Sequence, residues 1–210
     1  MREQMRLPGL ATQQESTNSF DLEIVLAESK HDKKTADDFV VRYHSYVASA
    51  KTVGRCIKYI ILYQEEMVGT FWLGSGFRPT PKAILNHFGL SQSQFDPIFN
   101  EVADNKRFCL ISPFPNSGSI VLSKIRKRSK QDWLNRYGNN LQAIVTTIGG
   151  GKSGSVYKAD NWICIGETSG LPPNRKSVSM KWDDSETIKS RFVKPTGQDR
   201  KKIFITNRIG

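Results

Sequence analysis

A glycine-rich loop followed by a tyrosine carries the residues whose types and spacing predict chemistry most directly. The stretch Leu141–Gly170, LQAIVTTIGGGKSGSVYKADNWICIGETSG, combines a β-branched run, a turn at Gly149–Gly151, a short helix and a second apolar run at Trp162–Ile165. A strand that feeds such a loop and then a helix directs backbone N–H groups, and the positive end of the helix dipole, beyond the strand. The pattern predicts a site for a phosphorylated ligand or a developing negative charge.

The loop has two interpretations. Gly151, Lys152 and Ser153 complete the second half of the P-loop pattern GxxxxGK[ST], in the expected position between a strand and a helix. The first glycine of that pattern is replaced by Thr146, and too few residues follow to supply the remaining strands and the Mg²⁺-binding aspartate. The alternative, which we favour, is that Lys152 is a solvated turn residue.

The segment from Gly154 to Thr168, GSVYKADNWICIGET, resembles the closing segment of the Gcn5-related acetyltransferase (GNAT) fold. In that fold a short helix carrying a tyrosine leads through a tight turn to an aromatic residue and a strand ending in glycine. More narrowly, the segment is similar to Mom-like DNA-modification proteins of phages and to DruA-like proteins of anti-phage defence. The DruA-like proteins share the Tyr, the Ala, the Asn-Trp pair and the Gly-Glu-Thr at this spacing. The alternative is that Tyr157 and Trp162 pack the helix onto the sheet.

Apolar periodicity predicts the remaining elements. Strands are expected at 21–27, 55–63, 67–73, 107–112 and 141–147, and a long helix from about residue 116. A further helix is expected from Thr35, and its apolar face consists of Ala36, Phe39, Val40, Tyr43 and Val47. A helical insertion at 78–105 carries aromatic residues that form either a satellite core or a substrate cleft. This order matches the GNAT order and predicts an α/β (α+β) fold with a mixed central sheet flanked by helices.

The two ends of the chain differ in composition from the middle. Residues 1–19 are rich in Gln, Ser, Thr and Asn, which predicts a flexible tail. Residues 171–210 hold ten basic and four acidic residues. We expect a basic C-terminal extension there, packed on a GNAT-like domain of residues 20–170.

The resemblance places a donor at the start of the long helix. In GNAT folds the N-terminus of this helix receives the pyrophosphate of coenzyme A, and the corresponding residues here are Ser112, Asn116, Ser117, Gly118 and Ser119. Small residues at a helix start expose N–H donors to an anion. The usual Q/RxxGxG/A signature is absent, and the Mom-like and DruA-like proteins also have an atypical loop here. We expect acetyl-CoA, another acyl-CoA-like thioester or an amino-acid-derived donor.

The resemblance also assigns catalytic roles. The sheet is expected to splay between the strand of Arg107 and the strand that begins at Leu141, leaving a slot for the donor and a target amine. By resemblance, Tyr157 is placed to be either the acid that protonates the leaving thiolate or an orienting hydroxyl. Arg107 corresponds to an arginine that Mom-like proteins hold near their active site, where it would anchor a phosphate or carboxylate.

One position departs from the pattern of these relatives. Mom-like and DruA-like proteins carry an aspartate ten residues before the tyrosine, and here that position is Thr147. A threonine cannot act as a carboxylate base. Either the base lies elsewhere, with Asp160 and His44 as candidates, or the chemistry has changed or been lost. The alternative for His44 is helix packing.

Basic residues favour a polyanionic partner. The net charge is +11 and the sequence pI is about 9.7. Lys124, Lys127 and Arg128 fall at i, i+3 and i+4 of the long helix, which predicts a phosphate-tracking face, with a solvated helix face as the alternative. The expected DNA-binding set is Lys124, Arg126, Lys127, Arg128, Lys130, Arg175 and Lys176.

Chemistry on a base of double-stranded DNA requires the base to be flipped out or single-stranded, and then stacked on an aromatic ring. Tyr46, Trp72 and Phe77 are the candidates for this role. No metal site is predicted, because the three cysteines show no CxxC spacing and lie within apolar runs. No apolar run is long enough to span a membrane, so a cytoplasmic protein of a bacterial host cell is expected.

Taken with the resemblance, these features predict a DNA-modification protein of a phage or mobile element. It would transfer an acyl or related group to an amine of a DNA base. The alternative is a non-catalytic DNA-binding subunit of a DruA-like anti-phage defence system.

Overall fold

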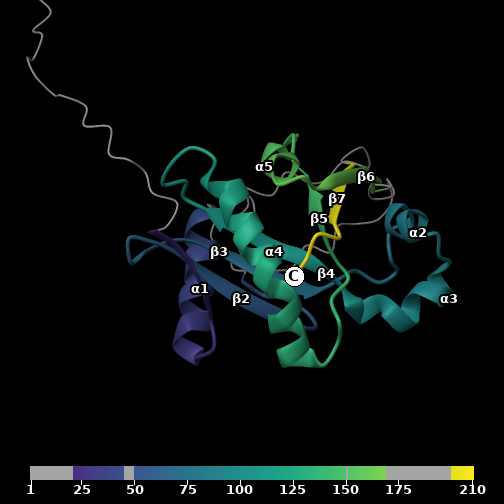
Figure 1. The fold of residues 1–210 in the computed structure, drawn as a ribbon, viewed down its shortest axis with the longest axis horizontal. Helices are drawn as coiled ribbons and strands as arrows, with labels where there is room; N and C mark the ends of the chain where they lie inside the picture. Colours follow the sequence, from purple (N-terminus) through teal and green to yellow (C-terminus); the bar gives the residue numbers. More distant parts are fainter. Residues whose placement is uncertain (1–20, 45–49, 150, 169–199) are drawn as a thin grey trace, which may run out of the picture.

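A seven-stranded mixed sheet forms the centre of the molecule (Figure 1). The computed structural model describes residues 21–44, 50–149, 151–168 and 200–210. The strands lie in the order β1-β2-β3-β4-β5-β7-β6, and β4 and β5 are parallel while the other neighbours are antiparallel. Their bounds are β1 (Leu22–Leu26), β2 (Cys56–Tyr63), β3 (Glu66–Ser75), β4 (Val102–Leu110), β5 (Ala143–Ile148), β6 (Ile163–Glu167) and β7 (Lys202–Thr206).

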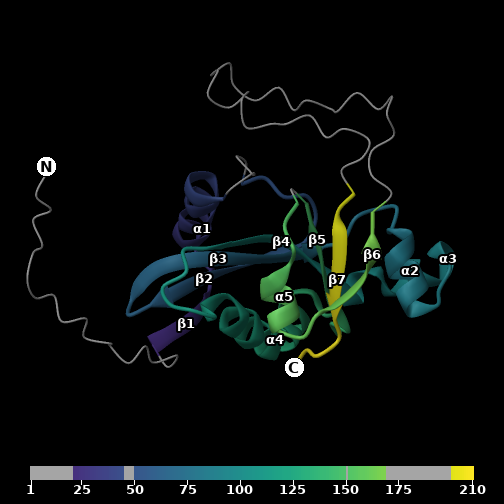
Figure 2. The same cartoon turned by 90° about the horizontal axis from the view of Figure 1, so that it is seen from above.

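Helices cover both faces of this sheet, and Figure 2 shows α1 on one side with α4 and α5 on the other. The predicted mixed sheet flanked by helices is confirmed, as are the predicted order of elements and the helical insertion. The insertion begins after β3 and ends at residue 101, where β4 starts. The helices are α1 (Lys30–Tyr43), α2 (Lys82–Phe88), α3 (Gln92–Phe95), the 3₁₀ helix η2 (Asp96–Glu101), α4 (Ser117–Tyr137) and α5 (Ser155–Ala159).

The last strand, β7, lies between β5 and β6 and pairs with both in antiparallel fashion. Residues 202–206 therefore belong to the same sheet as the rest of the domain, so residue 170 does not mark a boundary of the sheet. Arg175 and Lys176, two of the predicted DNA-binding residues, lie outside the described residues.

Alternate residues of each strand feed two different cores, as the two-residue period of a strand requires. On the face covered by α4 and α5, buried residues include Trp133, Ile144, Ile148 and Phe204. On the opposite face Ala143 and Val145 pack with Phe95 and Phe99 of the insertion. The aromatic residues of the insertion therefore form the satellite core that was one of its two interpretations.

The first helix begins five residues earlier than the sequence suggested. Its N-cap is Ser29, whose side chain accepts a hydrogen bond from the Asp32 amide while the Asp32 side chain accepts from the Ser29 amide. Thr35, the predicted start, lies inside the helix, and its hydroxyl donates to the His31 carbonyl one turn back. Of the expected apolar face, Ala36, Phe39 and Val40 are buried, Tyr43 is 44% exposed, and Val47 lies outside the described residues.

The turn before α5 depends on Gly154, which has a φ of +73°. A Cβ at this position would lie 2.7 Å from the Phe204 ring. Gly138, the C-cap of α4, has a similar φ of +71° but no atom within 4 Å of such a Cβ.

We therefore expect Gly154→Ala to destabilise the fold more than Gly138→Ala. Both substitutions carry the cost of a left-handed backbone, about 1–2 kcal/mol. Gly154→Ala adds overpacking against Phe204, about 1–3 kcal/mol more. Denaturant unfolding of the two variants measures the difference, and equal losses of unfolding free energy would contradict the predicted contact.

Candidate active site

The centre of the sheet opens between β4 and β5. These parallel strands pair only at Val102↔Ala143, Ala103↔Ile144 and Asp104↔Val145, although β4 continues to Leu110 and β5 to Ile148. The strands therefore diverge after three pairs. This is the splay that the resemblance implied between the strand of Arg107 and the strand that follows Leu141.

A β-bulge in β4 determines which side chains face each side of this opening. Trp72 of β3 pairs with Arg107 while Leu73 pairs with Asn105, so Lys106 is the extra residue. Without the bulge, Asn105 and Arg107 would share a face. With it, Asn105 points to the α4 and α5 face, and Arg107 shares the α1 face with Trp72.

Tyr157 of α5 is fixed beside the opening on the α4 and α5 face. Its ring is buried and packs on Phe108 and Phe204, and its hydroxyl accepts a hydrogen bond of 2.8 Å from the Asn105 side-chain amide. Because the amide occupies a lone pair of the oxygen, the phenol proton is directed to another acceptor. This is the geometry of a hydrogen-bond donor or acid at the splay.

Asp104 occupies the opposite face and is only 2% exposed. Its Oδ2 lies 3.2 Å from the ammonium of Lys106, and its Oδ1 has no hydrogen-bond partner among the described residues. Burial raises the pKa of Asp104 to about 6, although the charges of Lys106 and Arg107 act to lower it. A carboxylate with this pKa is suited to accept a proton near neutral pH.

A small cavity of about 20 Å³ borders Asp104. That volume accommodates about one water molecule. Thr147 lines the same cavity, with aromatic residues Phe77, Phe95 and Phe99. The position at which the resembling proteins carry an aspartate therefore lies beside a carboxylate that the neighbouring strand supplies.

Sequence analysis missed both Asp104 and Asn105. We expected the strand to begin at Arg107, because Asp104, Asn105 and Lys106 are polar residues of the kind found in turns. In the structure β4 starts at Val102. The available signal was the apolar pair at 102 and 103 before these residues, which together with Phe108–Leu110 outlines one interrupted strand.

His44, the other candidate base, lies at the C-cap of α1. Burial, followed by the positive charges of Arg107 and Lys152, lowers its pKa to about 4. It is therefore neutral at physiological pH. The structure brings His44, Arg107 and Lys152 together on the α1 face, whereas Tyr157 lies on the other face.

Asp160 has a structural role rather than the predicted catalytic one. Both of its oxygens bind Arg126, at 2.6 and 2.7 Å, and one also accepts from the indole N–H of Trp162 at 2.8 Å. The carboxylate is 4% exposed. A carboxylate engaged in a bidentate ion pair holds α5 against α4 and is poorly placed to act as a base.

The first turn of α4 contains the predicted donor-binding residues. Asn116 is the N-cap, and the Ser112 and Ser117 hydroxyls lie 2.7 Å apart in the loop that joins β4 to α4. A Cβ at Gly118 would lie 2.7 Å from Val156, so the glycine allows α4 and α5 to meet. The start of this 21-residue helix lies beside the short helix that carries Tyr157. The backbone N–H groups of Ser117 and Ser119 donate there to the Phe114 and Asn116 carbonyls.

The predicted basic face of α4 is only partly present. Arg126 is bound to Asp160, and Arg128 pairs with Asp132 at 2.6 Å. Lys127 and Lys130 are exposed. The arginines of this cluster therefore stabilise the fold, and its lysines are what the surface offers to a polyanion.

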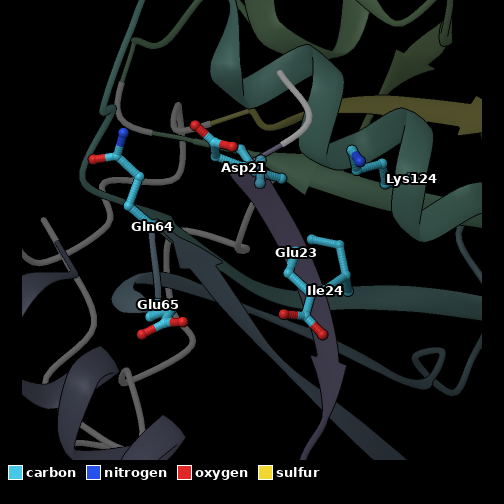
Figure 3. Close-up of a pocket in the computed structure, with 7 residues that line it drawn as sticks. Asp21, Glu23, Ile24, Gln64, Glu65 and Lys124 are labelled. Carbon is cyan, nitrogen blue, oxygen red and sulfur yellow. The ribbon is translucent and has the colours of Figure 1, made fainter. Parts of the chain in front are cut away.

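A groove of about 750 Å³ lies beside the edge strand β1 (Figure 3). Asp21, Glu23 and Glu65 line it together with Lys124 of α4. Lys124 therefore faces carboxylates rather than a uniformly basic surface. This groove is larger than the cavity at Asp104 but lies at the edge of the sheet, away from the splay.

The structure also bears on the P-loop interpretation of the glycine-rich loop and on the aromatic residues predicted to stack on a base. The glycine-rich loop leads into α5, which has five residues and begins at Ser155, so it lacks the long helix of a P-loop. Trp72 is fully buried, which removes it as a platform for a base. Phe77 is 54% exposed with Lys106 over its ring, and Tyr46 lies outside the described residues.

Comparison with solved structures identifies this architecture as the GNAT fold. An N-acetyltransferase from Staphylococcus aureus Mu50 matches with a TM-score of 0.52 and 11% identity over 90% of this chain and 99% of that chain. A GNAT-family acetyltransferase from Bacillus cereus ATCC 10987 matches with a TM-score of 0.48 and 11% identity over 90% and 99%. The aminoglycoside acetyltransferase AAC(6')-Ib, in complex with coenzyme A, matches at 0.46 and 10% over 89% and 95%.

No protein-family model matches the sequence, and no curated protein is similar to it. The shared fold is the GNAT fold that the resemblance implied. The narrower Mom-like or DruA-like relationship stays a prediction. Within the described residues, no helix is long and apolar enough to span a membrane, and no group of three or more His, Cys, Asp or Glu side chains is placed to hold a metal ion.

The raised pKa of Asp104 predicts a specific pH dependence of stability. The pKa of Asp104 in the native state, about 6, lies above the ordinary aspartate value of 3.8, so the native state binds the proton more tightly than the unfolded state. The associated stability is present below pH 4 and is lost as the pH rises through 6. We expect Asp104→Asn to gain on the order of 3 kcal/mol relative to wild type between pH 4 and pH 7.

Urea unfolding of both proteins across this pH range provides the measurement. Asp38→Asn is the control, because it removes one exposed carboxylate of α1 with the same change in net charge. Asp104→Asn also removes the ion-pair partner of Lys106, which lowers the free energy of unfolding at every pH. The comparison therefore uses the slope of the unfolding free energy against pH and not its absolute value. Identical pH profiles for the two variants would contradict a buried, protonatable Asp104.

Proposed function

We propose that this protein is an N-acyltransferase that moves an acyl group from a thioester to an amine at the β4–β5 splay. The observation that carries the proposal is the placement of a buried carboxylate, Asp104, and a buried phenol, Tyr157, on opposite faces of the same opening. Acyl transfer to an amine needs a group that takes a proton and a group that gives one. The two faces provide one of each.

The first turn of α4 fits the anionic part of such a donor. The positive end of the helix dipole favours a pyrophosphate, and the half-buried small residues Gly118 and Ser119 allow close approach. A coenzyme A thioester, when bound, supplies the electrophilic carbonyl. The loop from β4 to α4 joins this helix start directly to the splay, so both ends of a long donor have a place.

The proton transfers follow from the two side chains. The nitrogen of the neutral acceptor amine forms a bond to the acyl carbon as the C–S bond breaks. Asp104 accepts the proton that this nitrogen loses, and Tyr157 gives its proton to the departing thiolate. Asn105 holds the phenol in place for this step through its 2.8 Å hydrogen bond.

We propose an exocyclic amine of a DNA base as the acceptor, in a protein encoded by a phage or mobile element. The net charge of +11 and the exposed lysines of α4 support a polyanionic partner. The alternative, a non-catalytic DNA-binding subunit, would share the charge but would have no need for the Asp104 and Tyr157 arrangement. Detection of acyl transfer therefore separates the two.

Tyr157→Phe is expected to lower the rate of acyl transfer about 10²-fold or more, because the thiolate loses its acid. Cellular DNA digested to nucleosides, from cells expressing either protein, provides the first readout by mass spectrometry. We expect a nucleoside of increased mass with wild type and little or none with the variant. Unmodified DNA in both, together with DNA binding by the purified protein, would favour the non-catalytic alternative.

The donor site is tested by Ser119→Asp. A carboxylate in the first turn of α4 interacts favourably with the helix dipole and stabilises the folded state by about 0.3–1 kcal/mol, so folding is maintained. The same charge repels a pyrophosphate, and we expect coenzyme A affinity to fall roughly tenfold or more. Isothermal titration with coenzyme A gives the measurement, and neutral Ser119→Asn is the matched control. Equal affinity of both variants would place the donor elsewhere.

A further inference from the structure

Arg107 and His44 meet on the α1 face of the splay. Arg107 pairs across the sheet with Trp72, and Cys109 lies two residues further along the same face. Trp72 and Cys109 form one buried cluster with Phe39 and Val40 of α1. The backbone N–H of His44 donates to the Val40 carbonyl, so His44 is one helical turn beyond that cluster. The register and the helix repeat therefore place the two side chains near each other.

Lys152 approaches the same place from the other diverging strand. It lies in the loop after β5 and is exposed. Burial raises the pKa of the Cys109 thiol, and the positive charge of Lys152 opposes that rise. Burial, then Arg107, then Lys152 lower the pKa of His44. One cation from β4 and one from the β5 loop therefore converge beside His44, where the splay opens.

We infer that Arg107, Lys152 and His44 bind a phosphate group of the acceptor at the opening of the splay on the α1 face. The inference rests on the proposed function and deepens it, because it names the chemistry of the acceptor. Arg107 also acts on the charge of Asp104, so the amine-binding carboxylate and the phosphate site are close together. The acceptor is then an amine with a phosphate nearby, as a nucleotide unit of a nucleic acid is.

Phosphate fits this cluster better than a carboxylate does. A guanidinium presents a planar fork of N–H donors, an ammonium adds a point charge, and a neutral imidazole donates one further N–H. Three donors from three elements match the several oxygens of a phosphate, whereas a carboxylate is satisfied by one guanidinium. Burial, followed by the charges of the same two cations, lowers the pKa of His44 and keeps the imidazole neutral.

A competing explanation for the cations is the C-terminus of α1. Its last carbonyls carry the negative end of the helix dipole, which attracts Arg107 and Lys152 without any ligand. The two explanations differ in their response to added phosphate. A ligand site responds to phosphate, whereas a helix-capping arrangement does not.

The test is the pKa of His44, followed by NMR of the imidazole C–H signals as a function of pH. We expect a His44 pKa of about 4 without ligand. Inorganic phosphate should raise this pKa in a saturable way toward the ordinary histidine value of 6.5, and chloride at equal ionic strength should not. Arg107→Gln and Lys152→Gln should each raise the His44 pKa in the absence of phosphate and abolish the phosphate response. Lys30→Gln, at the opposite end of α1, should behave as wild type.

Two results would overturn the inference. A His44 pKa that rises in Lys152→Gln but ignores phosphate assigns the cations to the α1 C-terminus. A His44 pKa unaffected by either substitution shows that the cluster does not form. Coenzyme A binding to the same samples separates this failure from failure of the proposed function, because the donor site at α4 lies on the other face of the sheet.

Discussion

The divergence of β4 and β5 is the constraint on which the rest of the structure depends. Two parallel strands that pair at only three positions leave backbone N–H and C=O groups unpaired between them, and such groups are costly when buried. At this divergence α4 and α5 lie on one face of the sheet, and α1 and the insertion lie on the other. Side chains of both layers therefore border the place where the two strands separate.

The bulge at Lys106 determines which β4 side chains lie on each face of the sheet where β4 and β5 diverge. Because of the bulge, Asn105 points toward Tyr157 on one face, and Arg107 lies on the other face with Asp104. Asn105 and Arg107 are separated by only one residue, and in a regular strand they would share a face. Proton donation to a leaving group and proton removal from an acceptor are thus assigned to different faces. A regular strand would place Asn105 and Arg107 on one face and would break the hydrogen bond that holds the phenol.

Local sequence signals predicted the elements and the region of the site, but not the partners of each residue. The order of strands and helices followed from apolar periodicity, and Tyr157 and Arg107 followed from the resemblance. Asp104 was missed because a buried carboxylate in a strand is indistinguishable in sequence from a turn residue. The pairing of Asp160 with Arg126 joins residues 34 positions apart, and the insertion of β7 between β5 and β6 depends on strand pairing that is equally non-local. Such contacts have no local signature.

The substitution that seemed to argue against catalysis is explained by the geometry. Thr147 and Asp104 line the same cavity of about 20 Å³. Two carboxylates there would repel each other, and one of them would be held protonated with its pKa raised well beyond that of Asp104 alone. In the proposed mechanism one carboxylate is enough to accept a proton, and Asp104 of β4 supplies it beside Thr147 of β5. With Asp104 on β4, a threonine at position 147 keeps the cavity polar without adding a second buried charge.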